Sequence, residues 1–216
     1  MSESVLNHPL LSHPEHPSPP GLALAVARLA PDPADPGRPL RLVFTLRGPT
    51  TAIRWPEPLA PGAARRADGL WRHTCFEAFA TAPGAAGAAS GPYLEFNFAP
   101  SGAWAAYRFD GYRAGMRNEP LPLEPRVTIH DRDGERRIEI ACPWPAPLAG
   151  GAHEGAESGG GADRGMGPRA QASRIRLGLS AVLEAADGSL SYWALRHPPG
   201  RPDFHNAAGF QLEVAG

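Results

Sequence analysis

The stretch that decides the fold is Tyr93-Leu-Glu-Phe-Asn-Phe98. Its even-numbered residues are leucine or phenylalanine, and its odd-numbered residues carry a hydroxyl, a carboxylate or an amide. The segment Leu40–Arg47 has the same two-residue period, with apolar side chains at every even position. This period is typical of strands that bury one face against a core. The chain is therefore expected to be built from antiparallel strands.

Working outward from these two segments, the same pattern predicts further strands at 22–29, 52–55, 71–81, 104–109 and 210–214. Two hairpins are marked by Asp-Gly pairs, which tolerate the positive φ angles of tight reversals. Asp133-Gly134 is expected to join 126–130 to 137–142, and Asp187-Gly188 to join 174–184 to 189–196. Short strands, frequent glycine and proline, and the lack of a long helical stripe predict an all-β, jelly-roll-like antiparallel β-sandwich with few helices.

The length of 216 residues, 42% of them hydrophobic, suits one globular core. We expect a single domain over residues 21–216 with a flexible Gly/Ala-rich insertion at 150–172. Residues 1–20, which include several histidines and prolines, are expected to form a flexible leader. The three histidines of this leader are not expected to bind metal.

Composition and charge exclude several kinds of partner. A net charge of -1 provides no field for a phosphate backbone, so nucleic acid is not expected as a partner. No apolar run reaches the roughly 20 residues that span a bilayer, and the first residues do not resemble a secretory signal. Two cysteines are too few for a disulfide framework and favour a reducing compartment. We therefore expect a cytoplasmic protein without a membrane partner.

Two blocks combine aromatic rings with charged and amide side chains, Leu70–Phe79 and Ser191–Gly200. A sugar presents apolar C–H faces that stack on flat rings and hydroxyls that pair with carboxylate, amide and guanidinium groups. This mixture indicates a site for a carbohydrate or a related polar small molecule. The candidate ligand-binding residues are Trp71, Arg72, Glu77, Glu95, Asn97, Tyr107, Trp193, Arg196 and His197.

Within this set, Glu95 and Asn97 are two residues apart on one predicted strand, so they point to the same face. The alternative is that both simply face solvent and that Trp193 fills the core, because large aromatic residues usually belong to the core. The sequence leaves both interpretations open.

Other chemistries also have candidate residues. His197 or His205 could ligate a haem iron, although Asp203 and His205 are more typical of groups that fix a proline-rich loop by hydrogen bonds. Glu77 and Glu95 could form the paired carboxylates of a glycosidase. No nucleophile elbow or nucleotide-binding glycine motif is present. A non-enzymatic binding role without cofactor or metal is therefore the favoured hypothesis.

Four segments together resemble the bacterial DOMON-like proteins, relatives of the DOMON domains and the family 9 carbohydrate-binding modules. They are 71–77, 93–104, 107–112 and 191–205, and the resemblance extends over roughly residues 20–214. It implies a β-sandwich that binds a ligand without transforming it. Ligands in this superfamily are sugars in some branches and haem in others. The resemblance also implies a link to cell-wall precursor synthesis, since some members are associated with UDP-N-acetylmuramate dehydrogenase.

Overall fold

The computed structural model describes residues 6–63, 65–82, 91–144 and 174–215. Its regular elements are mainly strands, and the helical elements of these ranges are short 3-10 turns, including η1 (Thr50–Ala52), η2 (Leu70–Arg72) and η4 (Ala207–Gly209). The strands are β1 (Asn7–Ser12), β2 (Ala23–Leu29), β3 (Leu40–Arg47), β4 (Cys75–Thr81), β5 (Tyr93–Phe98), β6 (Trp104–Phe109), β7 (Arg117–Asn118), β8 (Arg126–Arg132), β9 (Glu135–Cys142), β10 (Arg174–Glu184), β11 (Leu190–Ala194) and β12 (Leu212–Ala215).

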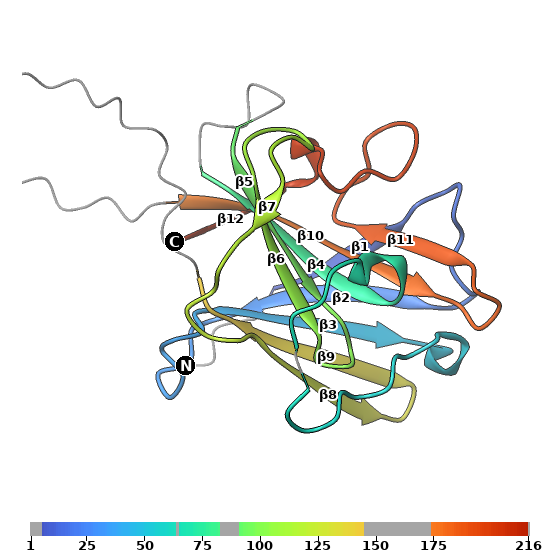
Figure 1. Ribbon diagram of the computed structural model, residues 1–216. Helices are drawn as coiled ribbons and strands as arrows, with labels where there is room; N and C mark the ends of the chain where they lie inside the picture. The colour runs from blue at the N-terminus through green and yellow to red at the C-terminus, as the bar shows by residue number, and fades with distance from the viewer. Residues whose placement is uncertain (1–5, 64, 83–90, 145–173, 216) are drawn as a thin grey trace, which may run out of the picture.

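The strands form two antiparallel layers that face each other (Figure 1). One layer has the order β7-β6-β5-β4-β10-β11, with β12 also paired to β10, and the other has the order β2-β3-β9-β8. Strand β1 joins the layers, because Asn7–Leu10 pair with β2 while Leu11 and Ser12 pair with β11. The antiparallel β-sandwich predicted from the sequence is confirmed.

The core lies between the layers and is built from the apolar faces that the two-residue period predicts. Phe96 and Phe98 of β5 lie in this core, as do Leu42 and Phe44 of β3. The rings of Phe44 and Phe76 lie 4.9 Å apart across the two layers. Burial of aromatic rings of this size supplies a large share of the stability of a sandwich.

Both Asp-Gly hairpins form where they were predicted. Asp133 and Gly134 are the two residues between β8 and β9, and Gly134 has a φ of 67°. Asp187-Gly188 lies in a longer loop between β10 and β11, where Ala185 accepts a backbone hydrogen bond from Gly188 and donates one to Ser189. A positive φ of 86° at Gly188 explains why glycine is needed there.

The structure corrects the expected flexible leader. Residues 7–12 form β1, and His13, which follows it, is buried with only 2% of its surface exposed. The prolines there suggested an unstructured segment, but Pro9 faces Ala25 within the β1–β2 ladder without preventing the pairing. Tertiary pairing to two strands thus overrides the local composition.

Two other predicted elements also differ. The segment 52–55 is not a strand; Ala52 ends the 3-10 turn η1, and Ile53 makes a single bridge to Ala185. The predicted strand 71–81 begins only at Cys75, because η2 occupies its first residues. The predicted insertion at 150–172 lies outside the described residues.

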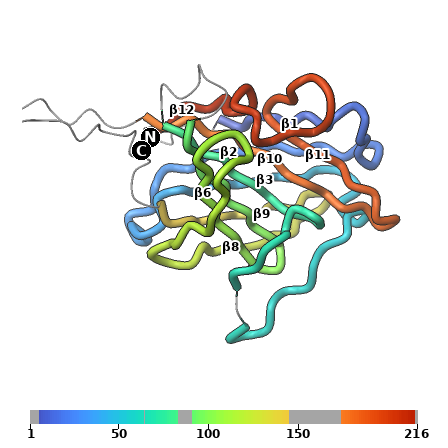
Figure 2. Tube along the Cα trace, turned by 45° about the horizontal axis from the view of Figure 1, so that its top comes forward, coloured from blue at the N-terminus to red at the C-terminus, as the bar shows by residue number. Residues whose placement is uncertain are grey.

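The layer that contains β4 and β5 is covered on its outer face as well as on its core face. Every residue of both strands is buried. The cover comes from residues 110–116 and from the segment 196–210, which is shown in red above β10 and β11 in Figures 1 and 2. Polar residues on this outer face are therefore enclosed and do not face open solvent.

Candidate functional site

A cavity of about 320 Å³ lies between the outer face of this layer and the segments that cover it. Strand residues form its floor and loop residues form its walls, and its volume is within the range of small-molecule sites. The floor is formed by Glu77, Glu95, Phe109, Val182 and Tyr192, and the walls by Trp71, Arg113, Met116, Pro202, Phe204 and His205.

Two buried carboxyl groups lie in the floor on neighbouring strands. Glu77 faces Asn97 in the β4–β5 ladder, and Glu95 faces Phe79, two residues further along β4. Both glutamates therefore point to the same face of the layer. They are only 3% and 5% exposed, so they are accessible mainly through the cavity.

Each carboxyl group has a polar neighbour in the same face. Asn97 Nδ2 donates a hydrogen bond of 2.7 Å to Glu95 Oε1, and the Ser180 hydroxyl donates a longer one of 3.4 Å to Glu77 Oε2. Burial raises the pKa of Glu95 to about 7, although the hydrogen bond from Asn97 opposes this change. Burial, together with the negative charge of Glu95, raises the pKa of Glu77 well above its usual value.

His205 forms part of the wall and is held by Tyr93. The Tyr93 hydroxyl and His205 Nδ1 share a hydrogen bond of 2.7 Å, and the backbone N–H of Arg113 donates to the same hydroxyl at 3.2 Å. His205 Nε2 lies 3.8 Å from Glu95 Oε2. Burial, and the nearby positive charge of Arg113, lower the pKa of His205 to about 4. This part of the wall is thus a neutral imidazole.

Asp203 links the two covering segments. It accepts hydrogen bonds from the Tyr112 hydroxyl at 2.7 Å and from the Arg113 guanidinium at 2.9 Å, and the His205 backbone N–H donates to it at 3.3 Å. Arg113 has a φ of 52°, in the left-handed region that residues with a Cβ seldom adopt. The ion pair with Asp203 and the contact with Tyr93 offset the strain of this backbone, which is of the order of 1 kcal/mol.

The turn after β1 supports the wall segment 196–210 from behind. His13 Nε2 donates to the Gly200 carbonyl at 2.9 Å, and His197 Nε2 donates to the Leu11 carbonyl at 2.8 Å. The His197 ring also lies 6.2 Å from the ring of Phe204, which lines the cavity. These contacts hold the segment that carries Phe204 and His205.

Trp71, Glu77 and Glu95 are the sequence-predicted site residues that the structure brings together in the cavity. Asn97 and Tyr107 lie directly behind them. Asn97 is bonded to Glu95, while the Tyr107 ring makes an edge contact with Trp71 at 6.0 Å and its hydroxyl donates to Asp68 at 2.6 Å.

Neither Asn97 nor Tyr107 lines the cavity itself, and the other four predicted residues do not line it either. Trp193 belongs to the inter-layer core, because it pairs with Ala181 and so points away from the outer face that carries Val182. Arg72 and Arg196 are exposed outside the cavity. His197 uses its Nε2 to support the wall, so its role in this structure is one of positioning.

Several cavity residues were missed by reasoning from the sequence. Arg113, Met116 and Phe204 lie in irregular segments with no periodic pattern. Tyr192 lies in the block Ser191–Gly200, and it points to the face opposite that of Trp193. Which of the two faces the core is known only from the pairing of the strands. The signal that could have found Arg113 is its place between Tyr112 and Gly115 in a glycine-rich turn.

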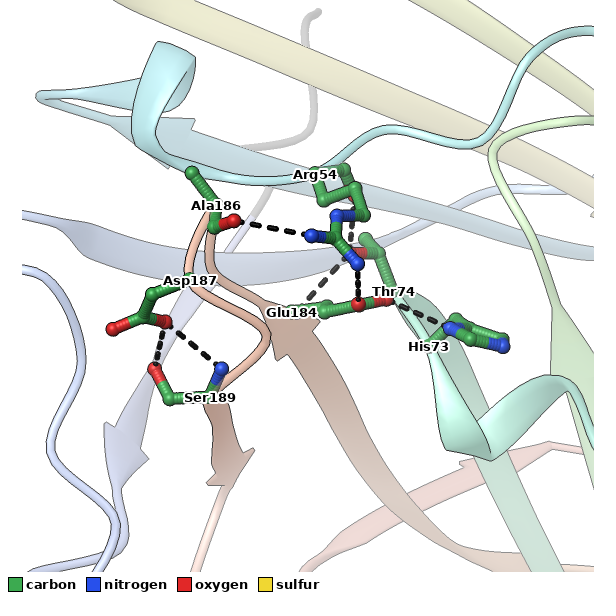
Figure 3. Close-up of polar contacts among 7 residues, drawn as sticks. All are labelled: Arg54, His73, Thr74, Glu184, Ala186, Asp187 and Ser189. Carbon is green, nitrogen blue, oxygen red and sulfur yellow. Dashed lines mark hydrogen bonds and ion pairs between the residues drawn. The ribbon is translucent and has the colours of Figure 1, made fainter.

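The far end of β10 carries a third buried carboxylate, Glu184, which is engaged by structural contacts (Figure 3). It accepts hydrogen bonds from Arg54 at 2.5 Å and from His73 Nδ1 at 2.7 Å. Its backbone N–H donates to the Thr74 hydroxyl, which in turn donates to the Arg54 carbonyl. This cluster ties the crossover between β3 and β4 to β10, and it leaves Glu77 and Glu95 as the acids available to a ligand.

Within the described ranges, no group of three or more histidine, cysteine or acidic side chains is arranged to hold a metal ion. No helix in this part of the chain is long and apolar enough to cross a membrane. Cys75 and Cys142 are buried free thiols, and burial raises the pKa of both.

No protein-family model and no curated protein matches the chain. Among solved structures, a proposed carbohydrate-binding protein from Bacteroides uniformis matches with a TM-score of 0.56 and 13% identity, over 95% of this chain and 84% of that one. A family 9 carbohydrate-binding module from Caldicellulosiruptor kristjanssonii in complex with cellotriose matches with a TM-score of 0.49 and 9% identity, over 98% and 82% of the two chains. The first of these matches supports the β-sandwich fold and, at this identity, the fold alone.

Proposed function

We propose that this chain is a non-enzymatic binding module for a carbohydrate or a related polar small molecule, held in the cavity on the outer face of the β4–β5 layer. The observation that carries the proposal is the combination of buried carboxyl groups in the floor with aromatic walls. Glu77 and Glu95 supply the acids, and Trp71, Tyr192 and Phe204 supply rings. The fold shared with the Bacteroides protein is compatible with this role.

The chemistry of the lining matches a saccharide. Ring faces stack on the apolar C–H faces of a pyranose, and carboxyl groups accept or donate paired hydrogen bonds to hydroxyls. The His205 imidazole and the Arg113 guanidinium add polar groups from the wall. The ion pair and hydrogen bonds of Asp203 hold that wall in place before a ligand binds, which reduces the entropy lost on binding.

Titration calorimetry with a panel of mono- and oligosaccharides, including muramic-acid precursors, tests the proposal. We expect binding by at least one member and a loss of affinity of about tenfold in Trp71→Ala, because a stacked indole contributes on the order of 1 kcal/mol or more. Arg72→Ala is the matched control, since the neighbouring side chain is exposed outside the cavity. A folded protein that shows no heat with any member of the panel contradicts the proposal.

One observation favours a second candidate, glycoside hydrolysis by Glu77 and Glu95. The pKa of Glu77 is raised well above its usual value, while that of Glu95 is about 7. Burial thus lets one of the two groups hold the proton that a general acid needs, and paired carboxyl groups on one face are the arrangement of a glycosidase. Turnover of chromogenic glycosides that is lost in Glu77→Gln would establish this function in place of simple binding.

We also propose a cytoplasmic location. Cys75 and Cys142 are buried and unpaired, which supports a reducing compartment such as the cytoplasm. The suggested link to cell-wall precursor synthesis is tested by including muramic-acid precursors in the panel.

A further inference from the structure

The charge distribution in the cavity is uneven. Glu77 and Glu95 lie in the floor, nearly fully buried, on adjacent strands. The hydrogen bonds they receive come from the neutral groups of Ser180 and Asn97. Two carboxyl groups enclosed without a cation in direct contact are costly to ionise, and such sites accept positive charge readily.

The positively charged and titratable groups that face this floor do not neutralise it. The Arg113 guanidinium is engaged by Asp203 at 2.9 Å on the opposite wall. His205 is held as a neutral imidazole, with Nε2 too far from Glu95, at 3.8 Å, for a hydrogen bond. When the floor carboxyl groups ionise, no described cationic group in direct contact balances their charge, so a cationic ligand can take the place of the protons that they otherwise hold.

Aromatic rings surround the same space. Trp71, Phe109, Tyr192 and Phe204 all line the cavity. Faces of aromatic rings attract ammonium groups, and this attraction is strongest where water is excluded. Buried acids beneath aromatic walls form an environment that favours a cation over a neutral group of the same size.

We propose that the ligand of this cavity is an amino sugar whose free ammonium group lies against Glu77 and Glu95. This inference rests on the proposed function, and it adds the class of sugar to it. The ammonium supplies the missing positive charge in the floor, while the sugar ring and hydroxyls contact Trp71 and the opposite wall. An N-acetylated or neutral sugar presents no such charge.

Three matched trisaccharides test the inference by titration calorimetry at about pH 7, below the pKa of an amine of this kind and close to the pKa of Glu95. They share a β-1,4-linked backbone and differ at carbon 2, which carries an ammonium in the glucosamine trimer, an acetamide in its N-acetylated form and a hydroxyl in cellotriose. We expect the glucosamine trimer to bind at least about tenfold more tightly than the other two. The comparison uses the wild-type chain, so it does not depend on whether a variant folds.

Two variants refine the result. Glu95→Gln keeps the size of the side chain and removes its charge, so the preference for the glucosamine trimer should fall by about tenfold. Glu57→Gln removes one charge from an exposed position outside the cavity, and it should leave the preference unchanged.

The outcomes separate the two levels of the proposal. Equal or tighter binding of cellotriose or the acetylated trimer overturns the amino-sugar inference and leaves the carbohydrate function intact. Tetramethylammonium is included as a cation that is not a sugar. If it binds and no sugar binds, both the inference and the carbohydrate function are overturned. Absence of binding by all these probes to folded protein also overturns both.

Discussion

Glu95 and His205 lie close together in the cavity lining, with 3.8 Å between Glu95 Oε2 and His205 Nε2, and their burial should produce opposite and measurable effects of pH on stability. The pKa of Glu95 is about 7 in the folded chain against 4.5 for a free side chain. Each pKa unit corresponds to about 1.4 kcal/mol, so burial of Glu95 costs the folded state about 3 kcal/mol. Because the folded state holds the proton more tightly, no cost arises below pH 4.5, and the loss of stability develops as the pH rises from 4.5 to 7.

The sign is reversed for His205. Its pKa is lowered from 6.5 to about 4, so the unfolded chain binds the proton more tightly. Its burial therefore costs nothing above pH 6.5, and about 3 kcal/mol of stability is lost as the pH falls from 6.5 to 4. In the wild-type chain the two effects oppose each other over the shared range, and each masks the other.

Single substitutions should expose each effect. Relative to wild type, Glu95→Gln should gain about 3 kcal/mol as the pH rises from 4.5 to 7, and His205→Gln should gain about 3 kcal/mol as the pH falls from 6.5 to 4. Urea unfolding followed by tryptophan fluorescence at a series of pH values measures both differences. Glu57→Gln is the control for removal of an exposed carboxylate. Difference curves that do not change with pH would refute the assignment of these groups as buried and shifted.

Two further predictions concern stability. Arg54→Ala removes the shortest hydrogen bond to the buried Glu184 and should lower the free energy of unfolding by about 1 to 2 kcal/mol. Arg47→Ala breaks an exposed ion pair with Glu135 and should lower it by less than about 0.5 kcal/mol. Thermal unfolding of the two variants tests this difference, and equal losses would contradict it. A Cβ at Gly178 would lie 2.5 Å from the buried ring of Phe210, so Gly178→Ala should cost about 1 to 3 kcal/mol in urea unfolding, and an unchanged midpoint would show that the ring can move.

The fold was predictable because the two-residue period records which face of each strand meets the core. Leu94, Phe96 and Phe98 lie between the layers as their spacing predicts. The strand β1 was not predictable in this way, since its residues alternate poorly and its pairing depends on β2 and β11 together. Local pattern carries no information about partners that lie far away in the sequence.

The candidate site was predictable in its floor and not in its walls. Glu77 and Glu95 lie on strands, so their shared face follows from parity and pairing. The position of Arg113 depends on a turn with a positive φ, and that of Phe204 depends on hydrogen bonds from the β1 turn. Trp193 was misplaced because an aromatic residue beside polar neighbours can belong to either face until the register is known.

The shared strand β1 also constrains how the molecule can be made. Leu11 pairs with Ala194, so β1 cannot join the two layers until β11, which is synthesised much later, is available. Closure of such distant segments carries a high entropic cost and is slow compared with the formation of local hairpins. A nascent or shortened chain that lacks β11 would expose one edge of β1, where unrelated strands can add. In this topology the two layers can therefore join only after most of the chain has been synthesised.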